Sequence, residues 1–307
     1  MKVLIIGLGS IARKHLVALQ SLSEPTQCYA LRSRADAAPL AGLQNVYSYT
    51  EAAALDPDWV LISNPTALHR ATIEKVLPWG KPLFIEKPAL DSLADTDLLL
   101  QRSEAVLTYV ACNLRFLEGL QFLRKYLKGR NIQEAQIYCG SYLPEWRPGT
   151  DFRQSYSARP ELGGGVHLDL IHELDYAYWL FGAPERHTAT LRSRSTLDIP
   201  AVDYAHYVLC YPRFVATVTL NYFRRDYRRH LELVLEDETL VFDLATNQVR
   251  TAGGVVLFRS EQTIADTYLP QLRYFTQLVR DQATTSMNSL REGLEVLKMV
   301  SHEYIDG

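Results

Sequence analysis

Cysteine is scarce in this sequence, and long apolar runs are missing. The 307 residues include four cysteines, Cys28, Cys112, Cys139 and Cys210, with no Cys-x-x-Cys pair and no spacing typical of a metal site. We interpret them as reduced packing residues. No apolar run approaches the roughly 18 residues that a transmembrane helix needs. Residues 1–6 lack the basic region, apolar segment and cleavage site of a secretion signal. We therefore expect a cytoplasmic protein without a membrane partner.

A strong charge of either sign is also missing. The formal net charge is −3 at pH 7, which argues against nucleic acid or an anionic membrane as the main partner. Apolar residues make up 47% of the chain, and its length favours two domains that share a cleft. The expected ligand is therefore a small soluble molecule.

A glycine-rich loop directly follows the first predicted strand, residues 2–6. In this loop, one glycine permits the tight turn, the next lets the backbone approach a pyrophosphate, and an alanine lets the helix over residues 11–22 pack closely. The helix N-terminus would point at the phosphates. The candidate dinucleotide-binding residues of this loop are Gly7, Gly9, Ser10, Ile11 and Ala12.

The acidic residue that usually follows the second strand of an NAD-binding domain is missing. The predicted strand over residues 27–31 is followed by Arg32, Ser33 and Arg34. Two cations and a hydroxyl suit a 2′-phosphate, so this end favours NADP over NAD. The alternative is an exposed basic loop that tolerates either cofactor.

The loop after a third buried run, residues 59–62, lies at the predicted carboxyl edge of the sheet, where ligands of doubly wound folds bind. Asn64 and Pro65 of this loop are candidate cofactor contacts. His69 is either a further contact or a residue of the cap region of the helix predicted over residues 67–77.

Lys87 stands at the end of the next strand, residues 82–85, between Glu86 and Pro88. A lysine in this place is costly unless it meets an anion or takes part in chemistry. Glu86 is a candidate to orient it. A further strand over residues 108–112 leads to Asn113.

Strands alternate with helices up to Arg115, which predicts one parallel doubly wound α/β domain over residues 1–115. Beyond it the pattern changes to a helix over residues 116–128 and then strands that alternate polar and apolar residues, as in 229–236. This pattern indicates an antiparallel sheet and predicts an α+β domain over residues 116–307. Further strands are expected at 136–142, 204–209, 214–222 and 238–243, a hairpin at 247–258, and closing helices at 270–281 and 290–304.

Three consecutive glycines, residues 163–165, precede a predicted helix over residues 166–182. On this helix Asp169, His172 and Glu173 project from one side. An imidazole beside a carboxylate suits proton transfer to or from a hydroxyl. Two alternatives are a buried polar helix whose groups satisfy one another, and a zinc site, although Tyr176 stands where the second histidine should be.

The succession of these motifs resembles the Gfo/Idh/MocA oxidoreductases, the glucose-fructose oxidoreductase and inositol dehydrogenase family. The resemblance runs along nearly the whole chain. The residues that carry it are Gly7, Gly9, Ala12, Pro65, His69, Glu86, Lys87, Pro88, Asn113, Arg115, the glycines at 163–165, Asp169 and His172.

The resemblance implies a Rossmann domain followed by an α+β domain with a large, open, mostly antiparallel sheet that forms homodimer or homotetramer contacts. It also implies hydride transfer between NAD(P) and a sugar, polyol or related carbonyl compound. Lys87 would lie near the nicotinamide and the substrate hydroxyl, and Asp169 and His172 would form the catalytic pair, with His172 as acid and base. The glycines would leave room for nicotinamide and substrate. With Arg32, Ser33, Arg34 and Asn64, which were named above from the sequence itself, the remaining candidate cofactor contacts are Glu86, Lys87 and Asn113.

The segment between the strand ending at residue 142 and the glycines is long and irregular, which is more often functional than filler. Arg147 and Arg153 are candidates to bind a carboxylate or phosphate, so we expect an anionic or nucleotide-linked sugar. A second basic cluster, residues 224–229, is favoured as a solvated strand end. The candidate substrate contacts are Arg115, Trp146, Arg147 and Arg153.

Two other functions stay open. One is a non-catalytic, dinucleotide-dependent sensor or regulatory sugar-binding protein. The other is hydrolysis or elimination with the nicotinamide as a recycled oxidant.

Overall fold

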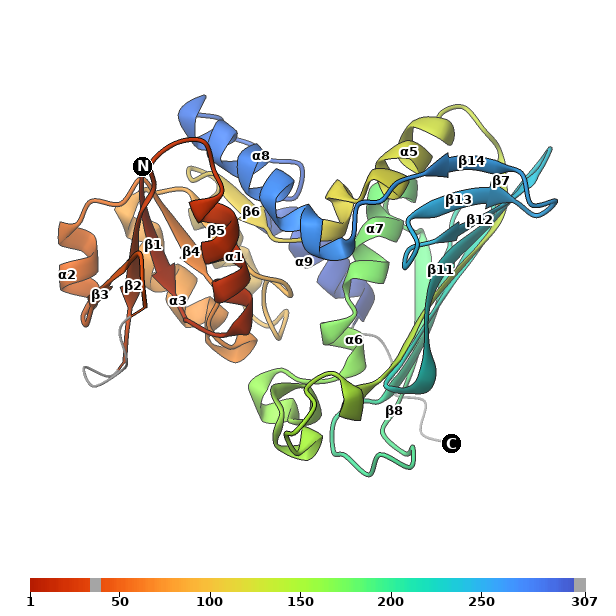
Figure 1. Cartoon of the computed structure of the whole chain (residues 1–307), viewed down its shortest axis with the longest axis horizontal. Helices are drawn as coiled ribbons and strands as arrows, with labels where there is room; N and C mark the ends of the chain where they lie inside the picture. The colour runs from red at the N-terminus through yellow and green to blue at the C-terminus, as the bar shows by residue number, and fades with distance from the viewer. Residues whose placement is uncertain (34–39, 301–307) are drawn as a thin grey trace. The chain divides into compact units, whose positions relative to one another are not determined.

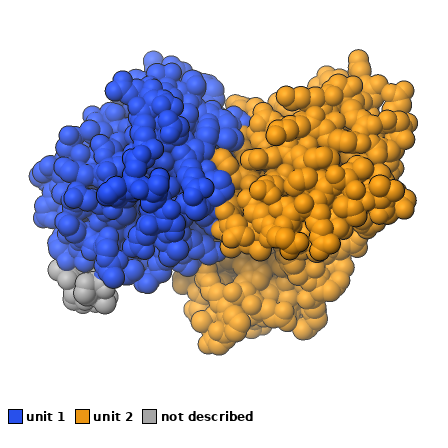
Figure 2. Space-filling model, turned by 45° about the horizontal axis from the view of Figure 1, so that its top comes forward, with its two compact units in different colours: residues 1–112, 268–294 blue, residues 113–267, 295–307 orange. Residues whose placement is uncertain are grey.

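The computed structural model describes residues 1–33 and 40–300 of the chain. They form two compact units, shown in Figure 2: unit 1 comprises residues 1–112 and 268–294, and unit 2 comprises residues 113–267 and the C-terminal segment from Glu295. The predicted boundary at residue 115 lies close to the first crossing between the units. Residues 268–294, which the sequence pattern assigned to the second domain, lie in unit 1.

Unit 1 is built on a six-stranded, wholly parallel sheet in the order β3-β2-β1-β4-β5-β6 (Figure 1). The central strands are buried on both faces, as their continuous apolar sequences predicted. The strands are β1 (Lys2–Ile6), β2 (Gln27–Leu31), β3 (Leu43–Val46), β4 (Trp59–Ile62), β5 (Leu83–Ile85) and β6 (Thr108–Val110). The helices are α1 (Ser10–Gln20), α2 (Tyr49–Ala54), α3 (His69–Val76), α4 (Thr96–Ser103) and α8 (Tyr268–Arg280).

An aromatic cluster explains why α8 belongs to unit 1. Phe275 of α8 packs edge-to-face on Trp59 and Phe84, with ring centroids 5.1 and 5.3 Å apart. The helix also packs on α1. The amphipathic pattern of α8 predicted a buried face but carried no signal of which sheet that face covers.

Unit 2 is built on an eight-stranded sheet in the order β14-β13-β12-β11-β7-β10-β9-β8. All neighbours are antiparallel except β7 and β10, which confirms the predicted mostly antiparallel sheet. Its strands are β7 (Ile132–Tyr142), β8 (Arg186–Arg192), β9 (Tyr204–Cys210), β10 (Val215–Asn221), β11 (Phe223–Leu235), β12 (Thr239–Asp243), β13 (Gln248–Thr251) and β14 (Val256–Arg259). Strands β3 and β8 were missed from the sequence.

Helices of unit 2 cover one face of this sheet, where α7 packs on β7, and α6 packs on β9 and β10 (Figure 1). The alternating burial along β9 follows from this one-sided cover. The helices are α5 (Glu118–Tyr126), α6 (Val166–Asp169) and α7 (His172–Phe181), and α9 (Leu290–Val300) runs from unit 1 into unit 2. The segment expected to be irregular contains short 3₁₀ helices at Leu143–Glu145, Phe152–Gln154, Tyr156–Ala158 and Pro160–Leu162.

The cysteines are free thiols, and three of them are buried. Burial raises the pKa of Cys28 to about 11 and that of Cys139 to about 12. Both therefore stay protonated and pack as small apolar groups, as predicted. None of the described helices has the length and apolar character needed to cross a membrane.

Candidate active site

The glycine loop after β1 has the geometry of a dinucleotide loop. Gly7 has a φ of +92°, and a Cβ there would lie 2.2 Å from the backbone nitrogen of Asn64, so only glycine fits. Gly9 caps α1 without a side-chain hydrogen bond and has open space where a Cβ would stand. The first N–H groups of α1 are thus left to a ligand, and Ala12 is fully buried as predicted. These residues fit a pyrophosphate.

Of the two arginines after β2, Arg32 lies within the described residues. Arg32 follows the strand, and its backbone N–H donates to Val46 O at 2.9 Å. Its Nη1 is buried and has no hydrogen-bond partner among the described residues. Ser33 is exposed, and Arg34 lies outside the described residues.

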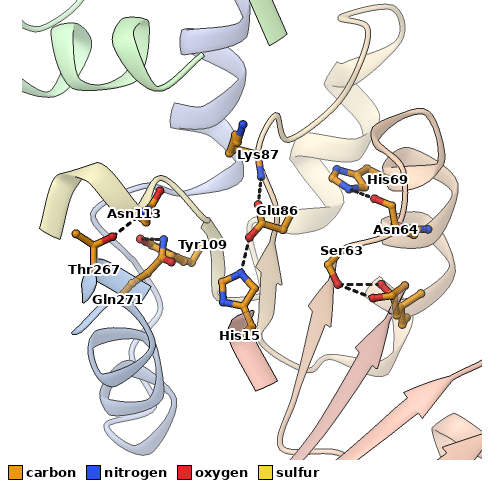
Figure 3. A network of polar contacts seen from close by, with 12 residues as sticks. His15, Ser63, Asn64, His69, Glu86, Lys87, Tyr109, Asn113, Thr267 and Gln271 are labelled. Carbon is orange, nitrogen blue, oxygen red and sulfur yellow. Dashed lines mark hydrogen bonds and ion pairs between the residues drawn. The ribbon is translucent and has the colours of Figure 1, made fainter. Parts of the chain in front are cut away.

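The His69 ring lies buried among backbone carbonyls, and its contact with a cofactor stays a prediction. Its Nε2 bonds to Asn64 O at 2.9 Å, and its Nδ1 bonds to Pro88 O at 3.1 Å and Ala89 O at 3.2 Å. Burial lowers the pKa of His69, and these carbonyls oppose the shift. His69 therefore ties the loop after β4 to the turn after Lys87. Figure 3 shows its bond to Asn64.

Lys87 follows β5 in a turn, and the side chain of the neighbouring Glu86 bonds to the backbone of that turn. The Glu86 side chain is buried; its Oε1 pairs with His15 Nε2, and its Oε2 accepts the Lys87 backbone N–H at 3.1 Å (Figure 3). The contact of Glu86 with a cofactor stays a prediction. Its carboxylate binds inside the protein and fixes the backbone of Lys87.

Asn113 is also buried. Its Nδ2 donates to Thr267 Oγ1 at 2.7 Å. These two residues are the ends of the unit 2 segment between the two crossings, so the bond closes that segment. The cofactor role of Asn113 stays a prediction.

The helix predicted over residues 166–182 is broken. Asp169 ends α6 and His172 begins α7, with a turn at Leu170 and Ile171 between them. The two functional candidates therefore stand at the facing ends of two helices instead of on one helical face. Leucine and isoleucine form helices readily, so this sequence gives no signal of the break.

The three glycines form a tight turn with close backbone packing, and their predicted role in leaving room for nicotinamide and substrate stays a prediction. Gly163 and Gly165 have φ values of +87° and +132°. A Cβ on Gly164 would lie 2.1 Å from Tyr156 O, and one on Gly165 would lie 2.5 Å from the His167 ring. The glycines allow close backbone packing under α6.

A tyrosine that the sequence analysis did not single out contacts Asp169. The hydroxyl of Tyr222 donates to Asp169 Oδ2 at 2.6 Å. Burial raises the pKa of Tyr222, and the Asp169 carboxylate adds to the shift, so the hydroxyl stays protonated and keeps donating. Trp146 packs edge-to-face on the Tyr222 ring at 5.3 Å. A buried tyrosine at the end of a strand needs a hydrogen-bond partner for its hydroxyl. This requirement is the signal by which the sequence could have indicated Tyr222.

Two buried ion pairs fix α7 just after His172. Arg115 donates from Nε and Nη2 to the two oxygens of Asp175 at 2.9 and 2.7 Å, and Arg229 Nε donates to Glu173 Oε1 at 2.6 Å. Arg115 is 0% exposed, and its role as a substrate contact stays a prediction. Arg229 belongs to the cluster expected to be a solvated strand end, and this expectation was wrong for that residue.

A cavity of about 390 Å³ lies within unit 2 beside the turn between α6 and α7. Trp146 lines it, as does Leu170 of the turn. Arg225 also lines it, with its guanidinium 4.2 Å above the Tyr142 ring and Nη2 donating to the Tyr142 hydroxyl at 3.0 Å. Its other lining residues are Cys139, Ser141, Tyr142, Glu145, Tyr227 and Arg229.

The other two candidate substrate contacts do not line this cavity. Arg147 is exposed, and the exposed Arg153 holds its guanidinium 4.6 Å from the centre of the Phe152 ring. Among the residues that the structure describes, no three His, Cys, Asp or Glu side chains are grouped to hold a metal.

Known proteins similar to this chain are oxidoreductases and sugar-modifying enzymes. It is 27% identical over 44% of its length to a 2,7-anhydro-N-acetylneuraminate hydratase of Mediterraneibacter gnavus. It is 28% identical over 64% of its length to an inositol 2-dehydrogenase of Streptomyces avermitilis. The matches span 36% and 58% of those relatives, so the chain covers less than two thirds of either.

A solved structure shares the fold. The UDP-N-acetylglucosamine 3-dehydrogenase of Acidithiobacillus ferrooxidans superposes with a TM-score of 0.79 at 19% identity, over 98% of this chain and 95% of that one. Two family models match in order: the oxidoreductase family with an NAD-binding Rossmann fold at residues 1–109, and the GFO/IDH/MocA C-terminal domain at residues 123–241. The chain therefore belongs to the Gfo/Idh/MocA oxidoreductase family.

Proposed function

We propose that the protein is an NAD(P)-dependent oxidoreductase that transfers hydride between a nicotinamide and the hydroxyl or carbonyl carbon of a sugar or polyol. The observation that carries the proposal is the facing pair of helix ends: Asp169, bonded to Tyr222 at 2.6 Å, and His172, on a helix fixed by buried ion pairs. A rigid, hydrogen-bonded set of this kind is what proton transfer to a hydroxyl needs.

The residues divide the proton chemistry among them. A bound nicotinamide supplies the hydride donor or acceptor. In an oxidation, His172 takes the hydroxyl proton as the carbon is oxidised, and in a reduction it returns that proton. Asp169, held by Tyr222, orients the imidazole. The ammonium of Lys87 donates to the substrate oxygen and stabilises the negative charge that develops on it.

NADP is the favoured cofactor within this proposal. The chain has Arg32 and Ser33 where an NAD-binding domain usually has an acid, and Arg32 Nη1 has no hydrogen-bond partner among the described residues. A 2′-phosphate would use that donor. Replacing Arg32 with Glu should weaken binding of NADPH much more than binding of NADH, as measured by cofactor fluorescence.

The substrate class we propose is a sugar that carries an anionic or nucleotide-linked group. The cavity beside the α6–α7 turn offers an indole from Trp146, on which sugar C–H groups pack, and the guanidinium of Arg225 at its edge. Two of the similar proteins are named for an anhydro-sialic acid and a UDP-sugar, which supports this class.

We also propose that copies of the chain pair through the eight-stranded sheet.

The test is a screen of neutral sugars, acidic sugars and nucleotide sugars with NADP and NAD, followed at the nicotinamide absorbance. With a substrate in hand, Lys87→Met and His172→Asn should each lower kcat by about 10²–10⁴-fold and leave cofactor affinity unchanged. Lys81→Met and His187→Asn are the matched controls and should keep full activity. Full turnover by the Lys87→Met, His172→Asn double variant would overturn the proposal.

A second candidate is favoured by the similarity to a hydratase: elimination or hydrolysis with the nicotinamide as a recycled oxidant. Stoichiometric formation of NAD(P)H excludes it. Cofactor binding with no turnover of any tested compound would favour the sensor alternative.

A further inference from the structure

His15 is a buried histidine that neither the sequence analysis nor the proposed chemistry uses. It lies on α1, the helix that begins at the dinucleotide loop, and is 0% exposed. Phe84 of β5 and Tyr268 of α8 pack edge-to-face on its ring, at 5.1 and 5.4 Å and interplanar angles of 78° and 79°. The orientation of the imidazole is therefore set by aromatic rings on two other elements of unit 1.

The fixed imidazole is directed at one carboxylate. His15 Nε2 pairs with Glu86 Oε1, whereas His15 Nδ1 has no hydrogen-bond partner among the described residues. The second oxygen of the same carboxylate, Oε2, accepts the backbone N–H of Lys87 at 3.1 Å. Figure 3 shows this line of contacts from His15 through Glu86 to the backbone of Lys87.

We propose that His15 is a positioning residue for Lys87: by fixing the Glu86 carboxylate, it ties the helix of the dinucleotide loop to the turn that carries the lysine. The inference rests on the proposed function, because it takes Lys87 to be the group that contacts the substrate oxygen.

The physical reason is that the two oxygens of the Glu86 carboxylate bond to two different donors, His15 and the Lys87 backbone N–H. Glu86 is nearly fully buried, so it keeps the orientation that its hydrogen-bond donors impose. Without the Nε2 donor, the carboxylate would turn toward another donor and release the Lys87 N–H. The direction of the lysine side chain follows from its backbone, and a displacement of about 1 Å at a reacting group costs on the order of 100-fold in rate.

Two conservative variants separate positioning from packing. Glutamine places its amide nitrogen near the site of Nε2, and asparagine places it near that of Nδ1, so both put an amide into the same buried position but only His15→Gln reaches Glu86. Because neither variant enlarges the residue, both should give folded protein. Leu19→Ala, which removes packing from the same helix, is the control for loss of stability alone.

The first readout needs no substrate. Hydrogen exchange of the Lys87 amide, measured by NMR, should be about 10-fold or more faster in His15→Asn than in wild type, and near the wild-type rate in His15→Gln and Leu19→Ala. Equal exchange in the two histidine variants would overturn the proposal, even if the screen above finds no substrate. Failure of the proposed function and failure of this inference are thereby distinguishable.

The second readout is kinetic. His15→Asn should lower kcat by about 10–100-fold with less than about a 3-fold change in KM for the cofactor, and His15→Gln should recover most of the loss. In a Lys87→Met background, His15→Asn should cause no further loss, because it acts through Lys87. The same fold loss with and without Lys87 would mean that His15 is only structural.

Discussion

The turn that carries Lys87 in unit 1 and the helices that carry Asp169 and His172 in unit 2 are held by different kinds of contact. In unit 1, the side chains of His69 and Glu86 bond to the backbone of the turn. In unit 2, two arginines bond to the carboxylates of α7, and the Tyr222 hydroxyl bonds to Asp169 at the end of α6.

The difference follows from where backbone groups are already paired. A helix satisfies its own N–H and C=O groups except at its ends, so neighbouring elements can hold it only through its side chains. A turn leaves backbone groups unpaired, and buried ones must find partners. The anchors of the turn therefore bond to neutral amides, whereas the anchors of α7 bond to charged groups. Removing one of the arginines that hold α7 should consequently cost more stability than removing an anchor of the turn in unit 1.

The largest expected effect is that of Arg115→Met. It leaves Asp175 buried without its bidentate partner, and breaking a buried pair from one side costs about 3–5 kcal/mol. Urea unfolding measures the loss of stability. The double variant Arg115→Met, Asp175→Leu should recover most of it, because no uncompensated charge remains.

The counterpart in unit 1 is His69→Leu, which leaves backbone carbonyls without their imidazole partner. This should cost about 1–3 kcal/mol in the same assay. A loss larger than that of Arg115→Met would contradict the distinction between the two kinds of anchor.

The sequence predicted the candidate site residues better than it predicted the residues that hold them in place. Residues such as Gly7, Lys87 and Asp169 stand in local patterns, because a strand followed by a particular turn is encoded within a few positions. The same local patterns predicted the two sheets. The partners of these residues are set by the fold: Tyr222 lies 53 positions from Asp169, and Arg115 lies 60 from Asp175.

Periodicity predicts which face of an element is buried, but it does not predict what that face meets. For this reason buried anchors such as Arg115, Glu86 and Asn113 were assigned to ligands, although each binds within the protein. A polar residue next to a motif looks the same in the sequence whether it contacts a ligand or another side chain.

The next effect concerns two histidines, the buried His69 and the half-buried His167. Carbonyls surround His69 and oppose the effect of burial on its pKa, whereas His167 packs against Gly165 and its Nδ1 has no partner among the described residues. Burial lowers the pKa of His167 from 6.5 to about 4. Between these pH values the unfolded chain binds a proton that the folded chain does not, so stability falls as pH drops through this window.

The free energy of unfolding should therefore decrease by about 2 kcal/mol through His167 between pH 7.5 and pH 5. Other groups titrate in this range, so the measured quantity is the difference between wild type and His167→Gln in urea unfolding at the two pH values. The variant should lose less stability on acidification. Parallel losses in the two proteins would show that His167 is not the group responsible.

The smallest expected effect is that of Tyr222→Phe, which removes the hydroxyl from Asp169 and keeps the ring that packs on Trp146. Because the bond is to a carboxylate that the proposed reaction uses, we expect a loss of about 1–1.5 kcal/mol in stability and a roughly 10-fold lower kcat. The matched control is Tyr207→Phe, since Tyr207 is equally buried and its hydroxyl has no hydrogen-bond partner among the described residues. The control should keep full activity. If both variants lose kcat to the same extent, the Tyr222 hydroxyl does not act through Asp169. The hydrogen bond from Tyr222 would then not be what orients the Asp169 carboxylate for proton transfer.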